Sequence, residues 1–265
     1  MTSASTLRAQ VEDRLRDRCP AAFSPQARPE MPVIPTGIAA IDQRIGGIPC
    51  GAITEICSNP LCSTGSTSLL TALLHRASEN HFCAWIDATD ALNPRWIHGA
   101  GVSLNRVLWV RCQERPAGKQ RLNRLEQALK AADLMMKANC GFSLVIVDLE
   151  DIAERLVRYV PLDVWYRFRL AAEKLSTALV FSTPFPVTGT SSALMLRLHS
   201  SGAALFRNPD FHGDGFQKHG FQDDASPHTR ILHAFDNQIE IIRSRDLKKN
   251  VQSAPITFSS LRRWY

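Results

Sequence analysis

A segment rich in small and hydroxyl-bearing residues, SNPLCSTGSTSLL, follows an apolar stretch that ends at Cys57 and leads into an amphipathic stretch. A strand, a glycine-containing loop and a helix in this order can hold a phosphate, because backbone N–H groups at the helix N-terminus point at the anion. The phosphate-loop pattern G-x-x-x-x-G-K-[ST] places its second glycine at Gly65, its lysine at Ser66 and its magnesium-binding hydroxyl at Thr67. The chemistry expected here is nucleotide phosphate recognition without a lysine.

Two replacements weaken this phosphate loop. Pro60 stands where the pattern has its first glycine, and proline can neither adopt a positive φ nor donate a backbone N–H. Serine at position 66 removes the positive charge that normally reaches the β- and γ-phosphates during transfer. Taken alone, STGSTS is also typical of an ordinary helix cap. The residues therefore predict a degenerate nucleotide site with no catalytic residues.

The surrounding segments predict the elements that would position this loop. Strand segments alternate with helical ones along the chain, which is typical of an α/β fold with a mostly parallel sheet and crossover helices. Each strand segment is almost continuously apolar, as expected where helices cover both faces of the sheet. Ligands of such sheets bind beyond the carboxyl ends of the strands, where the loop lies. The expected strands are 52–57, 82–88, 107–112, 144–149 and 178–183, and the expected helices are 66–79, 121–138 and 162–176.

The N-terminal part, residues 1–30, is predicted to be an amphipathic helix at 5–18 followed by a proline-rich linker. Leu7, Val11 and Leu15 recur every four residues and form its apolar face. That face either packs on the chain's own domain or docks on another protein, which makes these three residues candidates for partner binding.

Three further regions follow the linker. Residues 31–199 are predicted to form the core, and 200–230, rich in Gly, Asp, His and Phe, to form a mobile insertion. Residues 231–265 are predicted to hold a last strand at 239–245 and a basic, aromatic tail. In that tail Arg262, Arg263 and Trp264 are candidates for docking into a partner's groove, with packing onto their own domain as the alternative.

Composition restricts the class of protein. The 265 residues carry a net charge of +6, which is compatible with a nucleic-acid partner but does not establish one. The seven cysteines include no C-x-x-C pair and no His/Cys ligand spacing, so we expect no metal site and a reducing compartment. The chain shows no signal-peptide pattern and no apolar stretch of membrane-spanning length. We expect a soluble cytoplasmic, nucleoid-associated protein without a membrane partner.

Four segments in order resemble the RecA family of recombinases. They are GIAAIDQRIGGIPCGAITEICSNPLCSTGSTSLL, CAWIDATDALNP, VIVD and the late QIEIIRSR. The resemblance implies a RecA-like core with an N-terminal helix and a C-terminal strand extension. It also places Asp148, the last residue of VIVD, at the family's magnesium-organising aspartate. Through Gly65, Thr67 and Asp148 it leaves weak binding of ATP and Mg²⁺ open, although no cofactor is expected.

The departures from the family pattern concern hydrolysis. Thr89 stands where the family has the glutamate that activates the attacking water, and neighbouring Asp90 should point to the opposite face. The segment Ser182-Thr183-Pro184 occupies the region of the γ-phosphate-sensing glutamine. With Ser66 in place of lysine, these departures predict a protein that keeps the fold without working as an ATPase.

A closer resemblance lies in the middle of the chain. The segment LEQALKAADLMMKANCGFSLVIVDLEDI, followed by VPLDVWYRFRLAAEK, is similar to ImuA-type proteins, which are RecA-like accessories of bacterial error-prone polymerases. This resemblance implies a role in damage-induced (SOS) translesion synthesis. The implied partners are a Y-family-like polymerase homologue, an error-prone replicative-type polymerase and RecA itself.

RecA-like proteins contact single-stranded DNA through loops after the Asp148 strand and after the 178–183 strand. The candidates for DNA contact here are Arg155, Arg158, Arg167 and Arg169, because arginine neutralises phosphates. The alternative is that these arginines are ordinary solvated charges and that Trp165 and Phe168, spaced by three residues, belong to the core.

Three hypotheses follow. The first is a non-hydrolysing accessory of DNA repair that binds proteins and, as a further candidate partner, single-stranded DNA. The second is an active DNA-dependent ATPase and recombinase, against which Pro60, Ser66 and Thr89 count. The third is a regulator that inhibits another protein without contacting DNA.

Overall fold

The computed structural model describes residues 6, 11–15, 31–59, 64–113, 123–207, 230–245 and 255–261. The chain divides into two compact units, residues 1–31 and residues 32–265. In the first unit residues 11–15 are helical, and the side chains of Val11 and Leu15 are exposed. Leu7 lies outside the described residues.

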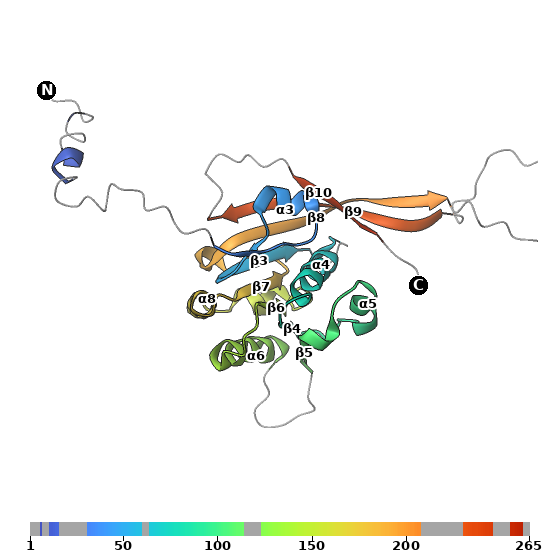
Figure 1. Cartoon of the computed structure of the whole chain (residues 1–265), viewed down its shortest axis with the longest axis horizontal. Helices are drawn as coiled ribbons and strands as arrows, with labels where there is room; N and C mark the ends of the chain where they lie inside the picture. The colour runs from blue at the N-terminus through green and yellow to red at the C-terminus, as the bar shows by residue number, and fades with distance from the viewer. Residues whose placement is uncertain are drawn as a thin grey trace, which may run out of the picture. The chain divides into compact units, whose positions relative to one another are not determined.

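The second unit is built on a sheet that has eight strands among the described residues, in the order β10-β9-β8-β3-β7-β6-β4-β5 (Figure 1). The strands from β8 to β5 run parallel, and β9 and β10 add to the β8 edge in antiparallel fashion. This arrangement confirms the predicted α/β fold with a mostly parallel sheet. The strands are β3 (Ala52–Ser58), β4 (Cys83–Asp87), β5 (Val107–Arg111), β6 (Leu144–Asp148), β7 (Ala178–Thr183), β8 (Ser192–Arg207), β9 (Arg230–Ser244) and β10 (Ile256–Leu261), and β1 (Val33–Ile34) pairs separately with β2 (Ile48–Pro49).

Helices cover both faces of the sheet, as Figure 1 shows. Alternate strand residues enter two separate apolar clusters: Ile146 lies in the cluster with α3, α4 and α5, whereas Val145 lies in the cluster with α6, α7 and α8. Because both faces are covered, all seven residues of β3 are buried. The helices are α3 (Ala39–Ile45), α4 (Ser66–Ser78), α5 (Pro94–Gly99), α6 (Arg124–Ala138), α7 (Glu154–Arg158) and α8 (Leu162–Leu175).

The three helices expected from the sequence form within a few residues of their predicted bounds. Helix α6 begins at a capping box, in which Asn123 accepts from the Glu126 amide and the Glu126 carboxylate accepts from the Asn123 amide. In α8 both Trp165 and Phe168 are buried, and the Trp165 ring packs edge-on against Phe181 with centroids 5.0 Å apart. The assignment of this aromatic pair to the core is confirmed.

The C-terminal third differs from its expected form. Residues 200–207, predicted to start a mobile insertion, are the end of β8, and β9 begins at Arg230, nine residues before the predicted strand. Residues 208–229 lie outside the described residues. The pairing of β8 with β9 contains three register irregularities, one of them between Ser200 and Gly202. Such irregularities and small residues interrupt the period-two pattern by which a strand is recognised in sequence.

The loop after β7 is held by a buried carboxylate on β3. Glu55 is completely inaccessible, and among the described residues it has no cationic partner. Its Oε1 accepts from the Thr183 hydroxyl and the Val187 amide, at 3.0 and 2.7 Å. Its Oε2 accepts from the Thr188 amide and hydroxyl. Burial raises the pKa of Glu55, and these hydrogen bonds oppose the rise.

Replacing Glu55 with glutamine should destabilise the fold even though the two side chains have the same shape. Each carboxylate oxygen accepts a backbone N–H, so the glutamine NH₂ group must face a donor whichever way the amide is turned. We expect Glu55→Gln to lower the free energy of unfolding by about 2–4 kcal/mol. Urea denaturation measures this change. Glu173→Gln on the exposed side of α8 is the control, and equal stability of both variants would contradict the role assigned to Glu55.

Candidate functional site

The candidate site lies where the carboxyl ends of β3, β6 and β7 meet the N-terminus of α4. The register of the sheet sets Cys57 beside Thr183 and Asp148 beside Ser182, so these strands end at the same level. Asp87, the last residue of β4, is aligned with Asp148. The topology therefore brings the sequence-predicted Asp148 to the same edge as the predicted phosphate loop.

Gly65 is required by the geometry of the phosphate loop. It precedes α4 in the left-handed region, with φ of 76°, which favours glycine. A Cβ atom at this position would lie 2.5 Å from Nδ2 of Asn237 on β9, so a side chain is also sterically excluded. Helix α4 then begins at Ser66, which is buried, and Thr67, which is exposed. Pro60 lies outside the described residues.

Ser66 is engaged by a carboxylate of the protein itself. The Ser66 hydroxyl donates to Oε2 of Glu150 at 2.6 Å, and the Ser182 hydroxyl lies 3.4 Å from the same oxygen. Glu150 follows Asp148 by two residues, and its amide donates to the Asp148 carboxylate. A carboxylate at a helix N-terminus is favourable for the reason that a bound phosphate is, because the helix dipole attracts negative charge. Glu150 thus supplies an anion where a nucleotide would bring one.

The electrostatics of the site disfavour a second anion. Burial and then the charge of Glu150 raise the pKa of Asp148 from 3.8 to about 7. The Asp87 carboxylate accepts hydrogen bonds from the Ala91 and Leu92 amides and from the Trp109 indole N–H. Its burial is therefore already compensated by hydrogen bonds within the protein. A triphosphate would therefore meet Glu150 and Asp148 without the lysine that offsets its charge.

The residues present do not fit an ATP–magnesium complex in the way the phosphate-loop pattern requires. Ser66 donates to Glu150 instead of presenting a cation. Within the part of the chain that the structure describes, no group of three His, Cys, Asp or Glu side chains is placed to hold a metal ion. No catalytic step through nucleotide or magnesium follows from this arrangement.

The position of the water-activating acid also departs from a hydrolytic site. Asp90, next to Thr89, has a positive φ of 62° and forms a bidentate ion pair with Arg111, at 2.5 and 2.6 Å. The Arg111 guanidinium lowers the pKa of Asp90. A carboxylate held in this way by Arg111 of the outer strand β5 is a poor base.

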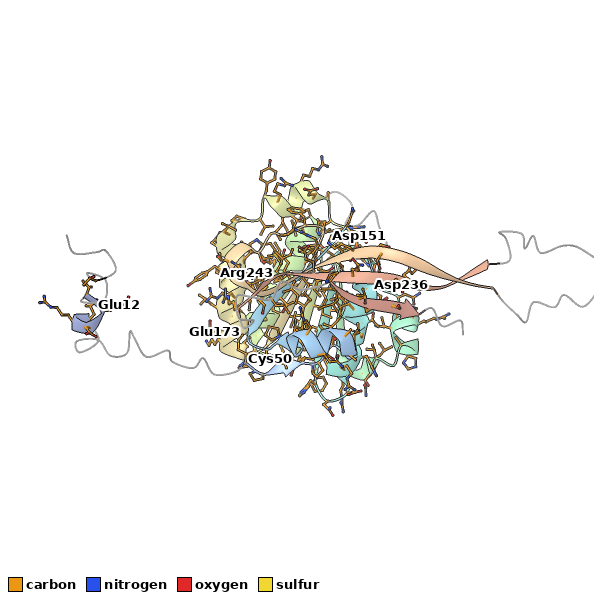
Figure 2. All side chains as sticks on the ribbon, turned by 90° about the horizontal axis from the view of Figure 1, so that it is seen from above. Glu12, Cys50, Asp151, Glu173, Asp236 and Arg243 are labelled. Carbon is orange, nitrogen blue, oxygen red and sulfur yellow. The ribbon has the colours of Figure 1, made fainter. Side chains whose placement is uncertain are left out.

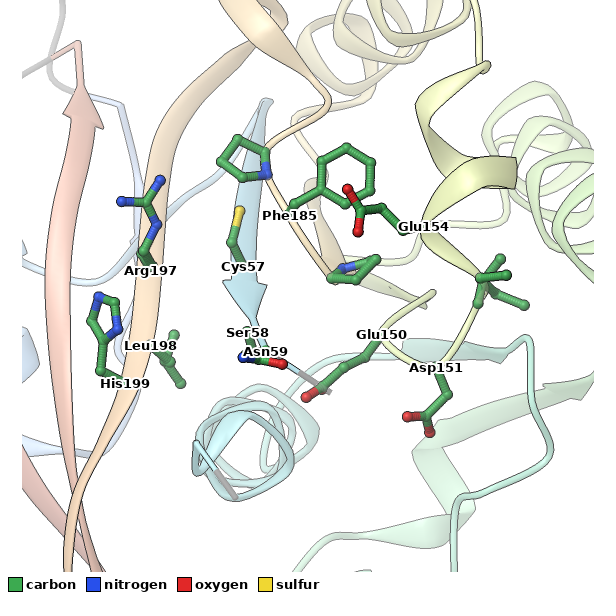
Figure 3. Close-up of a pocket in the computed structure, with 14 residues that line it drawn as sticks. Cys57, Ser58, Asn59, Glu150, Asp151, Glu154, Phe185, Arg197, Leu198 and His199 are labelled. Carbon is green, nitrogen blue, oxygen red and sulfur yellow. The ribbon is translucent and has the colours of Figure 1, made fainter. Parts of the chain in front are cut away.

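A pocket of about 680 Å³ opens beside these strand ends. Figure 3 shows Glu150 and Asp151 on one side of it and Arg197 and His199 of β8 on the other. Arg197 is paired with Glu240 of β9 at 3.2 Å. Since acidic and basic side chains line opposite walls, the pocket has no uniformly positive surface of the kind that binds phosphates.

The four candidate DNA-binding arginines lie on α7 and α8, and two of them are paired. Arg158 forms an ion pair with Glu154 and lies over the Phe185 ring, 5.0 Å from its centroid. Arg167 lies 4.0 Å from Asp163.

The other two arginines are less engaged. Arg155 is exposed, and Arg169 contacts only the Tyr166 ring, at 6.0 Å, among the contacts of the described residues. The structure thus leaves Arg155 and Arg169 as the better candidates for contact with an anionic partner.

Two residues of the site were not identified from the sequence. One is Glu150, because nothing in the sequence links this acidic loop residue to Ser66, which lies 84 residues away. Asn237, whose side chain closes on Gly65, comes from a strand whose register no sequence pattern reveals. The candidates Arg262, Arg263 and Trp264 lie outside the described residues.

Comparison with known proteins supports the fold class of this chain. The family model described as RecA N-terminal domain matches residues 9–154. Protein RecA of Marinobacter nauticus is 29% identical over 142 residues, which cover 53% of this chain and 38% of the relative. Protein RecA of Cutibacterium acnes is 33% identical over 117 residues (43% and 30%), and that of Frankia alni is 28% identical over 192 residues (69% and 50%).

The match to the first two relatives therefore spans only about a third of their length. No helix in the described part of the chain is long and apolar enough to cross a membrane.

Asp148 should make stability depend on pH. Its pKa is raised in the folded protein to about 7, so the folded state binds this proton more tightly than the unfolded state. Its contribution to the free energy of unfolding is therefore full below about pH 4 and falls as pH rises to about 7. We expect Asp148→Asn to stabilise the protein by about 1–3 kcal/mol at pH 8, with little effect at pH 4.

Urea denaturation of wild type and Asp148→Asn at both pH values measures the difference. Glu150→Gln should give a smaller stabilisation at pH 8, because it removes the charge that helps to raise the pKa of Asp148 but leaves Ser66 a weaker, neutral acceptor. The same stability difference between wild type and Asp148→Asn at both pH values would contradict the assignment.

Proposed function

The chain belongs to the RecA N-terminal domain family, and on that premise we propose that it is an accessory protein of DNA repair that does not hydrolyse ATP efficiently. In the finer form of this proposal it is an ImuA-type protein that supports damage-induced, error-prone DNA synthesis. Its partners are then components of error-prone DNA polymerases and RecA, and single-stranded DNA is a further candidate. Its place of action is the cytoplasm, at the nucleoid.

The hydrogen bond from Ser66 to Glu150 is the observation that carries the proposal. Phosphoryl transfer depends on cations that neutralise the developing negative charge and on a carboxylate or amide that orients the nucleophile. Here the protein's own carboxylate occupies the helix N-terminus, and Asp90 is held by Arg111. The fold retains its buried sheet while the chemistry of the site is altered, which favours a binding role.

The alternative of an active DNA-dependent ATPase and recombinase has less support. The sequence relatives are named Protein RecA, but the matched parts cover half of their length or less. A hydrolytic site would need a cation beside the phosphates, but Ser66 stands at the lysine position, and Arg197, which lines the pocket, is paired with Glu240. A regulator that inhibits another protein without touching DNA remains a separate hypothesis, favoured by the exposed side chains of Val11 and Leu15.

Contact with single-stranded DNA would use the arginines that have no ion pair among the described residues, Arg155 and Arg169. Tyr159 and Tyr166 are 83% and 51% exposed beside them and could stack on bases. Trp165 and Phe168 cannot, because they are buried. This part of the proposal rests on fewer side chains than the sequence suggested.

Restoring the lysine should not restore hydrolysis. In Ser66→Lys the new ammonium group would pair with Glu150, so we expect ATP binding no tighter than about 1 mM and no turnover. In the double variant Ser66→Lys, Glu150→Gln the lysine has no carboxylate at position 150 to pair with, so its charge is available to the phosphates. We therefore expect measurable ATP binding, still without turnover. Equilibrium binding of ATP–Mg²⁺ and phosphate release, each with and without single-stranded DNA, measure the two properties.

Glu150→Gln alone is the matched control for the double variant. Its expected ATP binding is weaker than that of the double variant, because the carboxylate is neutralised but no cation is added. DNA-stimulated phosphate release by the wild-type chain would overturn the non-hydrolysing assignment and support the recombinase alternative.

Partner capture tests the proposed role in cells. The full chain, purified from cells after DNA damage, should retain an error-prone polymerase component or RecA. A chain lacking residues 1–18 and a chain lacking 262–265 test the two termini, where Leu7, Val11, Leu15 and Arg262, Arg263, Trp264 are the candidate contacts. Retention of neither polymerase nor RecA by the full chain would remove the translesion role.

A further inference from the structure

Helices α7 and α8 carry a concentration of exposed apolar side chains. Figure 2 shows side chains projecting outward from this yellow-green part of the ribbon. The residues that we call the α7–α8 apolar surface are Leu156, Tyr159, Leu162, Tyr166 and Leu170, with exposed fractions of 41%, 83%, 69%, 51% and 47%. Single exposed leucines are ordinary, but apolar side chains gathered on one pair of adjoining helices mark an interaction site.

The spacing on α8 makes this surface continuous along the helix. Leu162, Tyr166 and Leu170 recur every four residues and therefore lie on one side. Trp165 and Phe168 lie on the other side and are buried against Phe181. Helix α8 is thus apolar on two faces, and its own core accounts for only one of them.

The surface is held in place before any partner arrives. The buried Trp165 fixes α8 on the sheet, and the helix ends at Ser176, whose amide bonds back to Ala172 and Glu173 carbonyls. At the other end, Leu162 lies beside the loop that Glu55 anchors, since a Cβ added to Gly189 would be 3.9 Å from the Leu162 Cδ2. A preorganised surface costs less entropy to occupy than a mobile one.

Positive charge flanks this surface. Arg155 and Arg169 have no ion pair among the described residues, and Arg158 and Arg167 are balanced by acids of their own helices. Arg243 donates to the carbonyl of Gly189, in the loop that lies close to Leu162. The charge that complements this border is negative.

We propose that the α7–α8 apolar surface docks an amphipathic helical segment of a partner protein whose apolar stripe is bordered by Asp and Glu. The inference rests on the proposed function, since it supplies the chemistry of one partner contact. The leucines and tyrosines spaced four residues apart would pack against the apolar stripe of the partner helix, as in other helix–helix contacts. The bordering arginines would favour a partner helix with acidic residues on both sides of that stripe.

A nucleic-acid strand fits this surface less well. Phosphates would engage Arg155 and Arg169, and bases could stack on Tyr159 and Tyr166. Three of the five apolar side chains are leucines, which neither stack nor neutralise charge. An acidic amphipathic helix uses the leucines and the arginines together.

The test uses the full chain and two synthetic peptides of about 16 residues, long enough for four helical turns. One carries leucines every three to four residues with glutamates on both flanks, and the other has lysine in place of each glutamate. Fluorescence anisotropy should give a Kd on the order of 10–100 µM for the acidic peptide and about tenfold weaker binding for the basic one.

Variants identify the surface. Leu162→Ser with Leu170→Ser should weaken the acidic peptide about tenfold. Arg155→Glu with Arg169→Glu should invert the preference between the two peptides. Leu134→Ser on α6, where the leucine is 57% exposed, is the matched control and should change nothing. Unchanged far-UV circular dichroism checks the fold of each variant, because all of these positions are exposed or only partly buried.

A labelled oligo(dT) strand is the competing probe. The paired leucine variants should leave its binding unchanged and the arginine variants should weaken it. Equal loss of peptide and oligo(dT) binding in the leucine variants, or failure of the wild-type chain to bind the acidic peptide, would overturn the docking inference. ATP turnover with intact peptide binding would instead overturn the proposed function and leave the docking surface standing.

Discussion

The contact between Ser66 and Glu150 determines what the strand-end site can do. A helix N-terminus below the carboxyl edge of a parallel sheet attracts an anion whatever its source. In this chain the anion is a carboxylate two residues beyond Asp148, and the hydroxyl that stands in the place of the lysine donates to it. Here the serine donates a hydrogen bond to Glu150, whereas a lysine at this position would form a partly buried ion pair with it.

Another carboxylate, that of the buried Glu55, has a different role near the same edge of the sheet. Glu55 is satisfied by four donors from the segment after β7, so it fixes the path of residues 183–188. In that segment Phe185 lines the strand-end pocket, and Gly189, the residue that follows the segment, lies close to Leu162 of α8. One carboxylate alters the chemistry of the site, and the other holds the neighbouring surface in shape.

The parts of this structure that the sequence predicts are those governed by local patterns. Buried parallel strands such as β6 are continuous apolar segments, and α6 shows its face through Leu125, Ala132 and Met136. Ser66 could be read because the spacing of a phosphate loop is short, and Thr89 because its segment resembles a family pattern. Glu150 could not, because its partner lies 84 residues away and a charged loop residue gives no sign of its target. The full length of β8 and β9 could not be predicted from the sequence for a related reason. These two strands are defined by their pairing with each other, and the register of that pairing is irregular.

Helix α8 links the altered site to a binding role. Its inner face, with Trp165 and Phe168, packs on the sheet that carries Asp148 and Ser182, and its outer face presents Leu162, Tyr166 and Leu170. Burying a tryptophan in the first face gives the helix the rigidity that makes the second face useful for recognition. Solubility alone would favour polar residues at these outward positions. The apolar residues found there are explained if a partner protein covers them. Such a partner is expected for the accessory protein proposed above.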